Sequence, residues 1–126
     1  MNAPSRTSVI SVCFNSSAVL GRFLASIPQG TSIILVDNGS SDLAETRALA
    51  KAHNALLITN KTNLGFGSAC NQGAAASQSK FLFFVNPDSF LEATTITALE
   101  SAAAAKPEAS AFNPQIIYSR GRVRAY

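Results

Sequence analysis

The chain has 126 residues, of which 47% are hydrophobic and 13% are charged. This balance is typical of one globular domain and excludes an intrinsically disordered chain. The net charge of +3 is small, and no broad basic face with interleaved aromatic residues indicates nucleic-acid binding. No segment approaches the ~20 apolar residues of a membrane span. We therefore expect a soluble cytoplasmic domain, with peripheral contact to a membrane surface left open.

Reactive side chains are few and scattered. Cys13 and Cys70 are the only cysteines. Without CxxC spacing, they predict two buried thiols in a reducing compartment, not a metal site or a disulfide. His53, the only histidine, lies near the end of a predicted helix, where a cation is favoured, so it is not expected to be catalytic.

Buried strands and amphipathic helices alternate along the chain. Runs of β-branched and apolar residues predict the strands, and apolar residues at helical spacing predict the helices. In chain order we predict strand 8–14, helix 18–27, strand 32–36, helix 42–53, strand 55–59, helix 66–77, strand 81–85 and helix 93–105. A short strand over 110–112 and an edge pairing over 116–118 are expected after them.

Local signals mark the helix starts. Asn15, Ser16 and Ser17 offer N-cap oxygens to the first helix, and Asp42 with Glu45 forms a capping-box-like pattern at the second. The third helix has an inward stripe of small residues, Ala69, Cys70, Gly73 and Ala74. Such a stripe lets a helix approach a sheet or a ligand closely, although the glycine lowers helix propensity by roughly 1 kcal/mol relative to alanine.

The alternation of strands and helices predicts the fold class. Connections of this length imply right-handed crossovers and a mostly parallel sheet. We predict an α/β fold, a Rossmann-like sheet with helices on both faces, in one domain over residues 1–126. The continuous apolar run 81–85 suits a strand covered on both faces. No closing helix follows Arg124, so we expect a domain truncated before its second half.

Polar side chains follow three of the predicted strands. Asn15 follows the first, Asp37 and Asn38 end the second, and Asn86 and Asp88 follow the fourth. Ligands of open α/β sheets bind beyond the carboxyl ends of the strands, so we expect these groups to share one site. The third helix starts at the same edge, and helix N-termini favour phosphate groups. The combination indicates a nucleotide-like ligand.

Several motifs are absent, and simpler roles stay open. No GxGxxG follows the first strand and no GxxxxGK[ST] occurs, which disfavours dinucleotide and P-loop folds. No GxSxG or Cys/His pair supports hydrolase chemistry. Asp37 and Asp42 remain open as helix caps, Asn63 and Asn71 as turn and helix-surface residues, and Asp88 as a turn acid.

Four segments are distinctive in combination: Ser8–Asn15 (SVISVCFN), Val36–Asp42 (VDNGSSD), Asn63–Gly73 (NLGFGSACNQG) and Val85–Asp88 (VNPD). In this order and spacing they resemble the family 2 inverting glycosyltransferases, and most of all their rhamnosyltransferase-like branch. The resemblance runs from Ser8 to about Glu92, most of the chain. It implies a GT-A fold that binds a nucleotide-diphosphate sugar for transfer to an acceptor hydroxyl with inversion.

The resemblance also implies residue roles. Phe14 and Asn15 border the nucleoside, and Asp37 hydrogen-bonds the base. Residues 86–88 take the place of the family's Asp-x-Asp signature, so Asp88 would hold Mg²⁺ or Mn²⁺, which neutralises charge on the leaving diphosphate. The implied donor-nucleotide residues are Phe14, Asn15, Asp37, Asn38, Asn63, Gly65, Asn71 and Asn86, and the implied metal ligand is Asp88.

Two departures from the family pattern bear on activity. Asn86 replaces the first acid of the signature, which leaves one carboxylate beside the phosphates, a reasonable arrangement for Mg²⁺. The family's catalytic base, an Asp or Glu, lies in the second half of the domain, and Glu92, Glu100 and Glu108 do not match its position. The catalytic residue is therefore left unassigned.

Three functions remain in competition. The first is a glycosyltransferase of cell-surface polysaccharide biosynthesis, with a nucleotide-sugar donor and a glycan or lipid-linked acceptor. The second is a catalytically incomplete nucleotide-sugar-binding or interaction module from a truncated gene product. The third and weakest is a nucleotidyltransferase-like domain, which rests on fold analogy alone.

Overall fold

The structure is a computed structural model that describes residues 5–118 and 123–124. The chain divides into two compact units, Met1–Leu91 and Glu92–Tyr126. Among the described residues, the first unit contains an open sheet and three helices, and the second contains one helix and a small two-stranded sheet.

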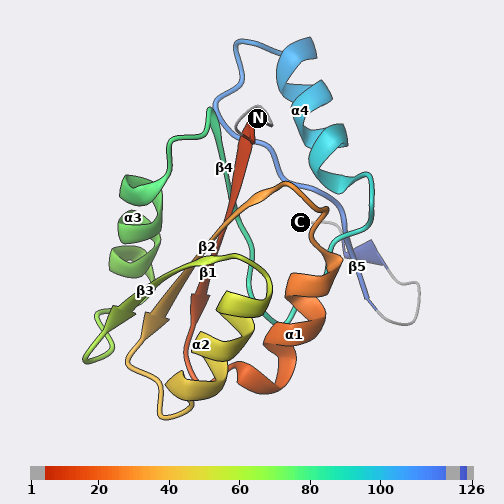
Figure 1. Ribbon diagram of the computed structural model, residues 1–126. Coiled ribbons are helices and arrows are strands. Elements are labelled where there is room, and N and C mark those ends of the chain that lie inside the picture. Colours follow the sequence, from red (N-terminus) through yellow and green to blue (C-terminus); the bar gives the residue numbers. More distant parts are fainter. Residues whose placement is uncertain (1–4, 119–122, 125–126) are drawn as a thin grey trace. The chain divides into compact units, whose positions relative to one another are not determined.

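Parallel strands form the sheet of the first unit (Figure 1): β1 (Thr7–Cys13), β2 (Ser32–Asn38), β3 (Leu56–Asn60) and β4 (Phe81–Phe84). Their order is β3-β2-β1-β4, and every neighbouring pair is parallel. The register pairs Cys13 with Asp37 and Asp37 with Thr59. The carboxyl ends of β1, β2 and β3 therefore lie at one edge, and the predicted parallel sheet is confirmed.

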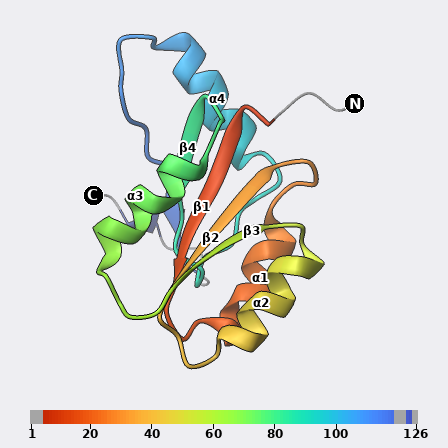
Figure 2. The ribbon, with the colours of Figure 1, turned by 60° about the vertical axis from the view of Figure 1, so that its left-hand side comes forward.

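Helices cover both faces of this sheet. α1 (Ser17–Ser26) and α2 (Leu43–Ala52) lie together on one face, and α3 (Phe66–Ala76) lies on the other (Figure 2). This arrangement confirms the predicted Rossmann-like architecture.

The core lies between the central strands and their covering helices. Ile10 of β1, Leu35 of β2 and Phe23 of α1 are almost completely buried. α3 approaches the sheet closely, because a Cβ added at Gly73 would lie 2.5 Å from Cγ2 of Ile10. The predicted small-residue stripe of α3 thus serves a close helix–sheet contact.

The expected helix caps are not formed as predicted. Ser16 precedes α1, but its side chain makes no cap hydrogen bond and instead bonds the backbone of Phe14. The cap of α1 comes from Asp42, whose Oδ2 accepts a 2.9 Å hydrogen bond from the backbone N–H of Ser17. Asp42 makes no side-chain cap to its own helix α2. The capping box with Glu45 is therefore wrong, because the carboxylate is directed to the neighbouring helix.

The prediction that the fourth strand is covered on both faces is also wrong. β4 is an edge strand of the described sheet, and its residues alternate between half-buried and exposed. Leu82 and Phe84 are 40% and 45% exposed. A continuous apolar run predicts that a strand forms. Whether both faces of that strand are covered depends on neighbouring elements, which the run itself does not specify.

The second unit begins with α4 (Thr95–Ala105). Residues 110–112 form no strand, since Ser-Ala-Phe contains no β-branched residue to favour one. β5 (Ile116–Ile117) pairs antiparallel with β6 (Val123–Arg124) in a sheet of its own, so the edge pairing expected over 116–118 does not extend the main sheet. Within residues 5–118 and 123–124, no helix combines the length and apolar character needed to cross a membrane.

Candidate functional site

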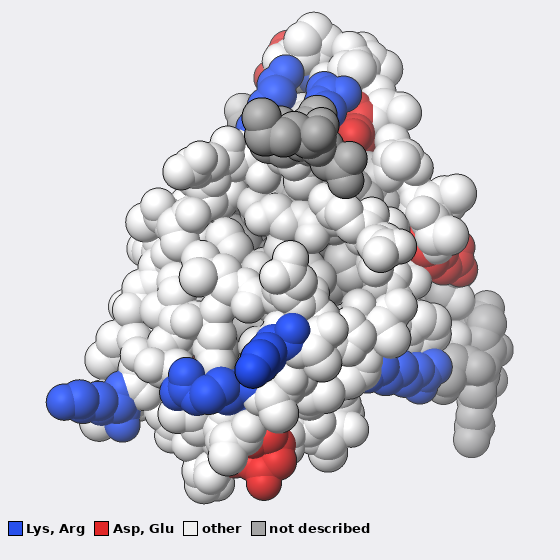
Figure 3. All heavy atoms as spheres, viewed as in Figure 1, with Lys and Arg blue, Asp and Glu red and all other residues white. Residues whose placement is uncertain are grey.

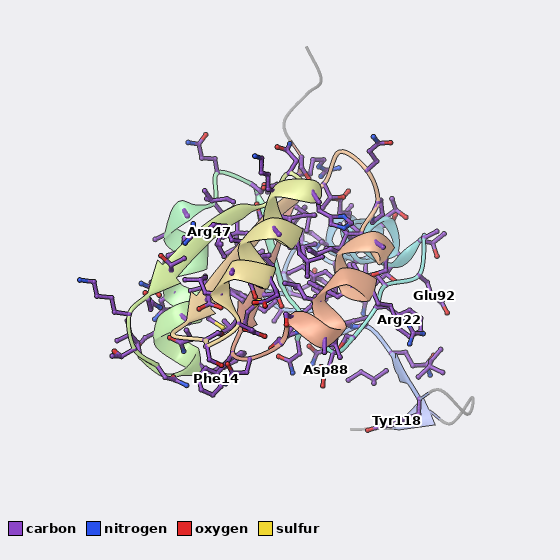
Figure 4. All side chains as sticks on the ribbon, turned by 60° about the horizontal axis from the view of Figure 1, so that its bottom comes forward. Phe14, Arg22, Arg47, Asp88, Glu92 and Tyr118 are labelled. Atoms are coloured by element: carbon purple, nitrogen blue, oxygen red, sulfur yellow. The ribbon has the colours of Figure 1, made fainter. Side chains whose placement is uncertain are left out.

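A pocket of about 310 Å³ lies at the carboxyl ends of β1, β2 and β4 in the first unit. Open α/β sheets bind ligands at this edge. The volume of the pocket falls at the lower end of the range for ligand pockets. Figure 4 shows Phe14 and Asp88 at this end of the domain. The pocket is lined by Val12, Phe14, Ser16, Val19, Asn38, Asn63, Phe66, Asn86, Pro87 and Asp88.

Two aromatic side chains in the pocket wall are largely exposed. Phe14 directly follows β1 and is 51% exposed, and Phe66 starts α3 and is 61% exposed. Flat apolar rings that face solvent are surfaces on which a nucleobase stacks. Sequence reasoning identified Phe14 and missed Phe66. The available signal was a large aromatic residue that starts a helix whose inward stripe is otherwise small.

Asn38 holds the loop that forms one side of the pocket. Its Nδ2 donates to Oδ1 of Asn63 at 3.0 Å and to the carbonyl of Gly65 at 3.1 Å. Its Oδ1 accepts from Nδ2 of Asn60 at 3.2 Å and from the backbone N–H of Leu64 at 3.0 Å. The amide is 2% exposed and its hydrogen-bonding capacity is filled. Asn38 therefore shapes the pocket from beneath.

Gly39 lets the same loop approach β2. Its φ is +85°, and an added Cβ would lie 2.8 Å from the carbonyl carbon of Thr62. Beyond the loop, Asn60 and Gln72 exchange two side-chain hydrogen bonds of 2.7 and 2.9 Å, which tie the end of β3 to α3. The loop over residues 60–65 is thus held by the hydrogen bonds of Asn38, by its close approach to Gly39 and by the Asn60–Gln72 pair.

Asp37 is completely buried and does not line the pocket. Its Oδ2 accepts hydrogen bonds from the backbone N–H groups of Gly39 at 3.2 Å and Ser40 at 2.9 Å. Its Oδ1 is buried without a hydrogen-bond partner in the described part of the chain. The structure thus places Asp37 in the turn that follows β2, beneath the surface of the site.

The Asn86–Asp88 turn forms the wall of the pocket opposite the loop over residues 60–65. The backbone N–H of Val85 donates to the carbonyl of Ile10 at 3.0 Å, and the N–H of Ser89 closes the turn on the carbonyl of Asn86 at 3.1 Å. Pro87 is buried and Asp88 is exposed. Among the described residues that line the pocket, Asp88 alone carries a charge. No group of three His, Cys, Asp or Glu residues in the described ranges is arranged to hold a metal ion.

Besides Asp37, three of the predicted donor-site residues lie outside the pocket wall. Asn15, with a φ of +51°, accepts at Oδ1 from the backbone N–H of Ser41 and joins two loops. Gly65, with a φ of +88°, forms the turn before α3. Asn71 is exposed on α3. Phe14, Asn38, Asn63, Asn86 and Asp88 are brought together.

The two cysteine thiols are unreactive at neutral pH. Burial, together with the nearby carboxylates of Asp37 and Asp42, raises the pKa of the Cys13 thiol to about 12. Burial also raises the pKa of Cys70, although this side chain is only half-buried. Both thiols are therefore protonated at neutral pH, and neither supplies a nucleophile to the site.

A second hollow lies at the opposite end of the sheet. It is lined by residues that include Ser32, Leu56 and Ser79 and contains no charged side chain among its described walls. Ser8 fills this end with hydrogen bonds to the hydroxyls of Ser32, Ser77 and Ser79. We therefore place the candidate site at the carboxyl edge.

An open parallel sheet with a pocket across its carboxyl ends defines an α/β ligand-binding domain. The chain belongs to Glycosyl transferase family 2, which it matches over residues 8–125. This confirms the resemblance found in the sequence.

The curated relatives are glycosyltransferases. The N-acetylglucosaminyl-diphospho-decaprenol L-rhamnosyltransferase of Mycobacterium tuberculosis is 32% identical over 123 residues, with 86% of this chain and 40% of that protein covered. An uncharacterised glycosyltransferase of Mycobacterium bovis is 29% identical over 97 residues, with 77% of this chain and 43% of that protein covered. The chain thus spans about two fifths of the length of these relatives.

Solved structures share the fold. TarS from S. aureus matches with a TM-score of 0.65 at 24% identity, covering 82% of this chain and 32% of that one. TarS in complex with UDP matches with the same TM-score at 23% identity. The predicted GT-A type of α/β fold is confirmed by this likeness.

Proposed function

We propose that this chain is the donor-binding part of an inverting glycosyltransferase and that its pocket holds a nucleotide-diphosphate sugar. The observation that carries the proposal is the pocket at the carboxyl edge of a family 2 domain, which is lined by exposed aromatic rings and by one carboxylate. The complex of the related TarS fold with UDP supports a nucleotide as the ligand class.

The pocket offers different chemistry at its two sides. Phe14 and Phe66 provide apolar rings for the nucleoside, and Asn63 lines the same side. Asn86 and Asp88 provide an amide and a carboxylate on the other side, where the diphosphate would lie. Asp37 supports the nucleoside side indirectly, by fixing the turn that follows β2.

A divalent cation fits Asp88 on the condition that the phosphates supply most ligands. The Asp88 carboxylate is exposed in the pocket on a turn closed by Ser89 and Asn86. One protein carboxylate plus phosphate oxygens is a usual environment for Mg²⁺. Asp88, with Asn86 beside it, would hold Mg²⁺ or Mn²⁺. When bound, the ion would neutralise charge on the leaving diphosphate.

In the complete reaction, an acceptor hydroxyl would lose its proton to a general base while its oxygen attacks the anomeric carbon. The bond between that carbon and the diphosphate would break, and the nucleoside diphosphate would leave with the electron pair. We assign no base among the described residues. The name of the M. tuberculosis relative specifies a diphospho-decaprenol acceptor and an L-rhamnosyl group, and we propose a lipid-linked acceptor here by that similarity.

Basic side chains support contact with a membrane surface that carries such an acceptor. Lys and Arg side chains form a row across the face built by α1 and α2 (Figure 3). α1 carries Arg22 and α2 carries Arg47 and Lys51, all exposed. Each basic side chain near an anionic leaflet contributes about 1 kcal/mol. Co-sedimentation with anionic vesicles should fall in Arg47→Glu/Lys51→Glu, while neutral vesicles should bind neither protein.

Calorimetry tests the donor site. UDP, dTDP and GDP are titrated into the chain with and without Mn²⁺, and we expect one nucleotide to bind more tightly with the metal. Asp88→Ala should remove that gain, by roughly tenfold or more for a lost charged ligand. Glu45→Ala, which removes an exposed acid from α2, is the matched control. A folded sample that binds none of the three nucleotides would contradict the proposal.

The alternative is a nucleotide-sugar-binding module that carries out no transfer. It is favoured by one observation, that Asp88 is the sole charged residue in the described pocket wall. An assay of sugar transfer from the nucleotide that binds to a polyprenyl-diphosphate acceptor separates the two. Donor binding without transfer supports the module, and turnover by the chain alone excludes it.

A further inference from the structure

The loop that carries Asp88 is attached to α1 at two consecutive residues. The Oγ of Ser26 accepts a 2.9 Å hydrogen bond from the backbone N–H of Leu91 and donates a 2.6 Å bond to the carbonyl of Phe23. The guanidinium carbon of Arg22 lies 4.3 Å from the centroid of the Phe90 ring. Figure 4 shows Arg22 and Asp88 on the same side of the domain.

The two attachments come from one side of the helix. Arg22 and Ser26 are four residues apart in α1, and residues at this spacing are neighbours on a helix surface. We call this pair the α1 clamp. Because the Ser26 hydroxyl also donates to the Phe23 carbonyl within its own helix, its orientation does not depend on the loop. The clamp is therefore a fixed surface against which the loop rests.

The loop is anchored at both of its ends. Phe90 is 55% exposed, so the Arg22 guanidinium covers a ring that otherwise faces solvent. Leu91 is 9% exposed, and its N–H needs a partner because a buried unpaired donor is costly. At the other end, the loop is fixed to β1 by the hydrogen bond from Val85 to Ile10. Asp88 lies between these two anchors.

We propose that Arg22 and Ser26 are positioning residues that hold the Asp88 loop in its binding conformation and thereby determine how strongly a divalent cation tightens nucleotide binding. This inference rests on the proposed function of Asp88. An ordered loop presents its carboxylate without an entropic cost at the moment of binding, and loss of the clamp restores that cost. Without a metal, the nucleoside would rest on Phe14 and Phe66, which line the pocket and lie outside the loop.

The test compares nucleotide binding with and without Mn²⁺ in the full chain. The readout is the ratio of the two dissociation constants for the nucleotide that wild type binds. Ser26→Ala and Phe90→Ala should each reduce this ratio by roughly fivefold, the order expected for one lost hydrogen bond or ring contact, and leave the metal-free constant unchanged. Ser101→Ala, at an exposed position on α4, is the matched control and should leave the ratio unchanged.

A double-mutant cycle separates positioning from a direct charge effect. If Arg22 acts through Phe90, then Arg22→Met with Phe90→Ala is no worse than either change alone. If Arg22 instead supplied charge to the phosphates, Arg22→Met would weaken metal-free binding and Phe90→Ala would not, and the inference would be overturned. Hydrogen exchange at the Leu91 amide should accelerate in Ser26→Ala, since its acceptor is removed.

The outcomes distinguish the two proposals. No Mn²⁺ dependence in wild type would overturn the metal role of Asp88, and this inference with it. Mn²⁺ dependence that survives Ser26→Ala and Phe90→Ala at full strength would overturn the inference alone. A reduced ratio with an unchanged metal-free constant supports both.

Discussion

The carboxylate of Asp42 lies 2.9 Å from the backbone nitrogen of Ser17, so the residue that precedes α2 caps the N-terminus of α1. The two residues are 25 positions apart. The contact joins the two helices that cover one face of the sheet at the edge where the pocket lies. It satisfies one of the N–H groups that a helix start leaves unpaired, with a charge that the helix dipole favours.

Asp42→Ala should lower the free energy of unfolding by about 1 kcal/mol, the usual cost of a lost N-cap acceptor. Glu45→Ala, an acid of the same sign in the first turn of α2, is the control and should change stability by less than about 0.5 kcal/mol. Urea denaturation followed by circular dichroism measures both. Equal effects of the two substitutions would mean that general charge, and not the bond to Ser17, is responsible.

The same contact predicts a pH dependence. The hydrogen bond from the Ser17 backbone lowers the pKa of Asp42 in the folded chain, whereas the unfolded chain has a pKa of about 3.9. The contribution of Asp42 is therefore complete above about pH 5 and is lost as the pH falls through the unfolded and then the lower, folded pKa. The stability difference between wild type and Asp42→Ala should be flat from neutral pH to about pH 5 and shrink in more acid solution.

Gly39 and Gly30 allow the cost of loop contact to be separated from the cost of backbone strain. Their φ angles are +85° and +86°, but an added Cβ meets the Thr62 backbone at Gly39 and nothing within 4 Å at Gly30. Gly30→Ala should cost about 1–2 kcal/mol for the left-handed backbone alone. Gly39→Ala should cost about 1–3 kcal/mol more from overpacking, and it should weaken nucleotide binding. Equal costs in denaturation would show that the 60–65 loop moves freely.

Asn38→Ala should destabilise the chain by about 2 kcal/mol, because four polar groups lose their hydrogen bond to the buried amide and the loop over 60–65 loses its support. Nucleotide affinity should fall as well, since Asn63 lies in this loop and Phe66 directly follows it, and both line the pocket. Asn71→Ala on the exposed side of α3 is the matched control, with an expected change within about 0.5 kcal/mol. Thermal unfolding and calorimetry measure the two effects. Unchanged stability in Asn38→Ala would contradict the supporting role.

Local sequence signals predicted the strands of the sheet well, because the evidence for a strand is contained in its own residues. The segments of β1 and β2 are short runs of apolar and β-branched residues, a pattern that favours a strand over a helix. The helix caps could not be predicted in the same way. The sequence offered the N-terminus of α2 as a local partner for the side chain of Asp42. The packing of α2 beside α1 gives it the Ser17 N–H of α1 instead.

The candidate site was predicted in part for the same reason. Polar residues after the strands identified the correct edge, since parallel strands end together. The sequence did not distinguish residues that face the pocket from those that build it. Asp37 is turned inward by the backbone of Gly39 and Ser40, and Asn38 is occupied by a loop more than 20 residues away. Phe66 was missed because its exposure depends on the turn at Gly65.

Gly73 should respond to alanine in the opposite sense from its helix propensity. Propensity alone predicts a gain of about 1 kcal/mol, but an added Cβ would lie 2.5 Å from Cγ2 of Ile10. The β-branched side chain of Ile10 is stiff at χ1 and is nearly completely buried in β1, so it cannot rotate away. We expect overpacking of about 1–3 kcal/mol to outweigh the gain and Gly73→Ala to lower the denaturation midpoint.

Gly67→Ala on the same helix is the control for Gly73→Ala. Nothing lies within 4 Å of its added Cβ, so it should leave stability unchanged or raise it by up to about 1 kcal/mol. Ile10→Ala removes the opposing Cγ2 at the cost of a cavity. If the contact with Ile10 causes the loss, the double variant Gly73→Ala/Ile10→Ala should be less destabilised than the sum of the two single variants. Additive costs would show that α3 shifts as a whole and that its distance from β1 is not set at this contact.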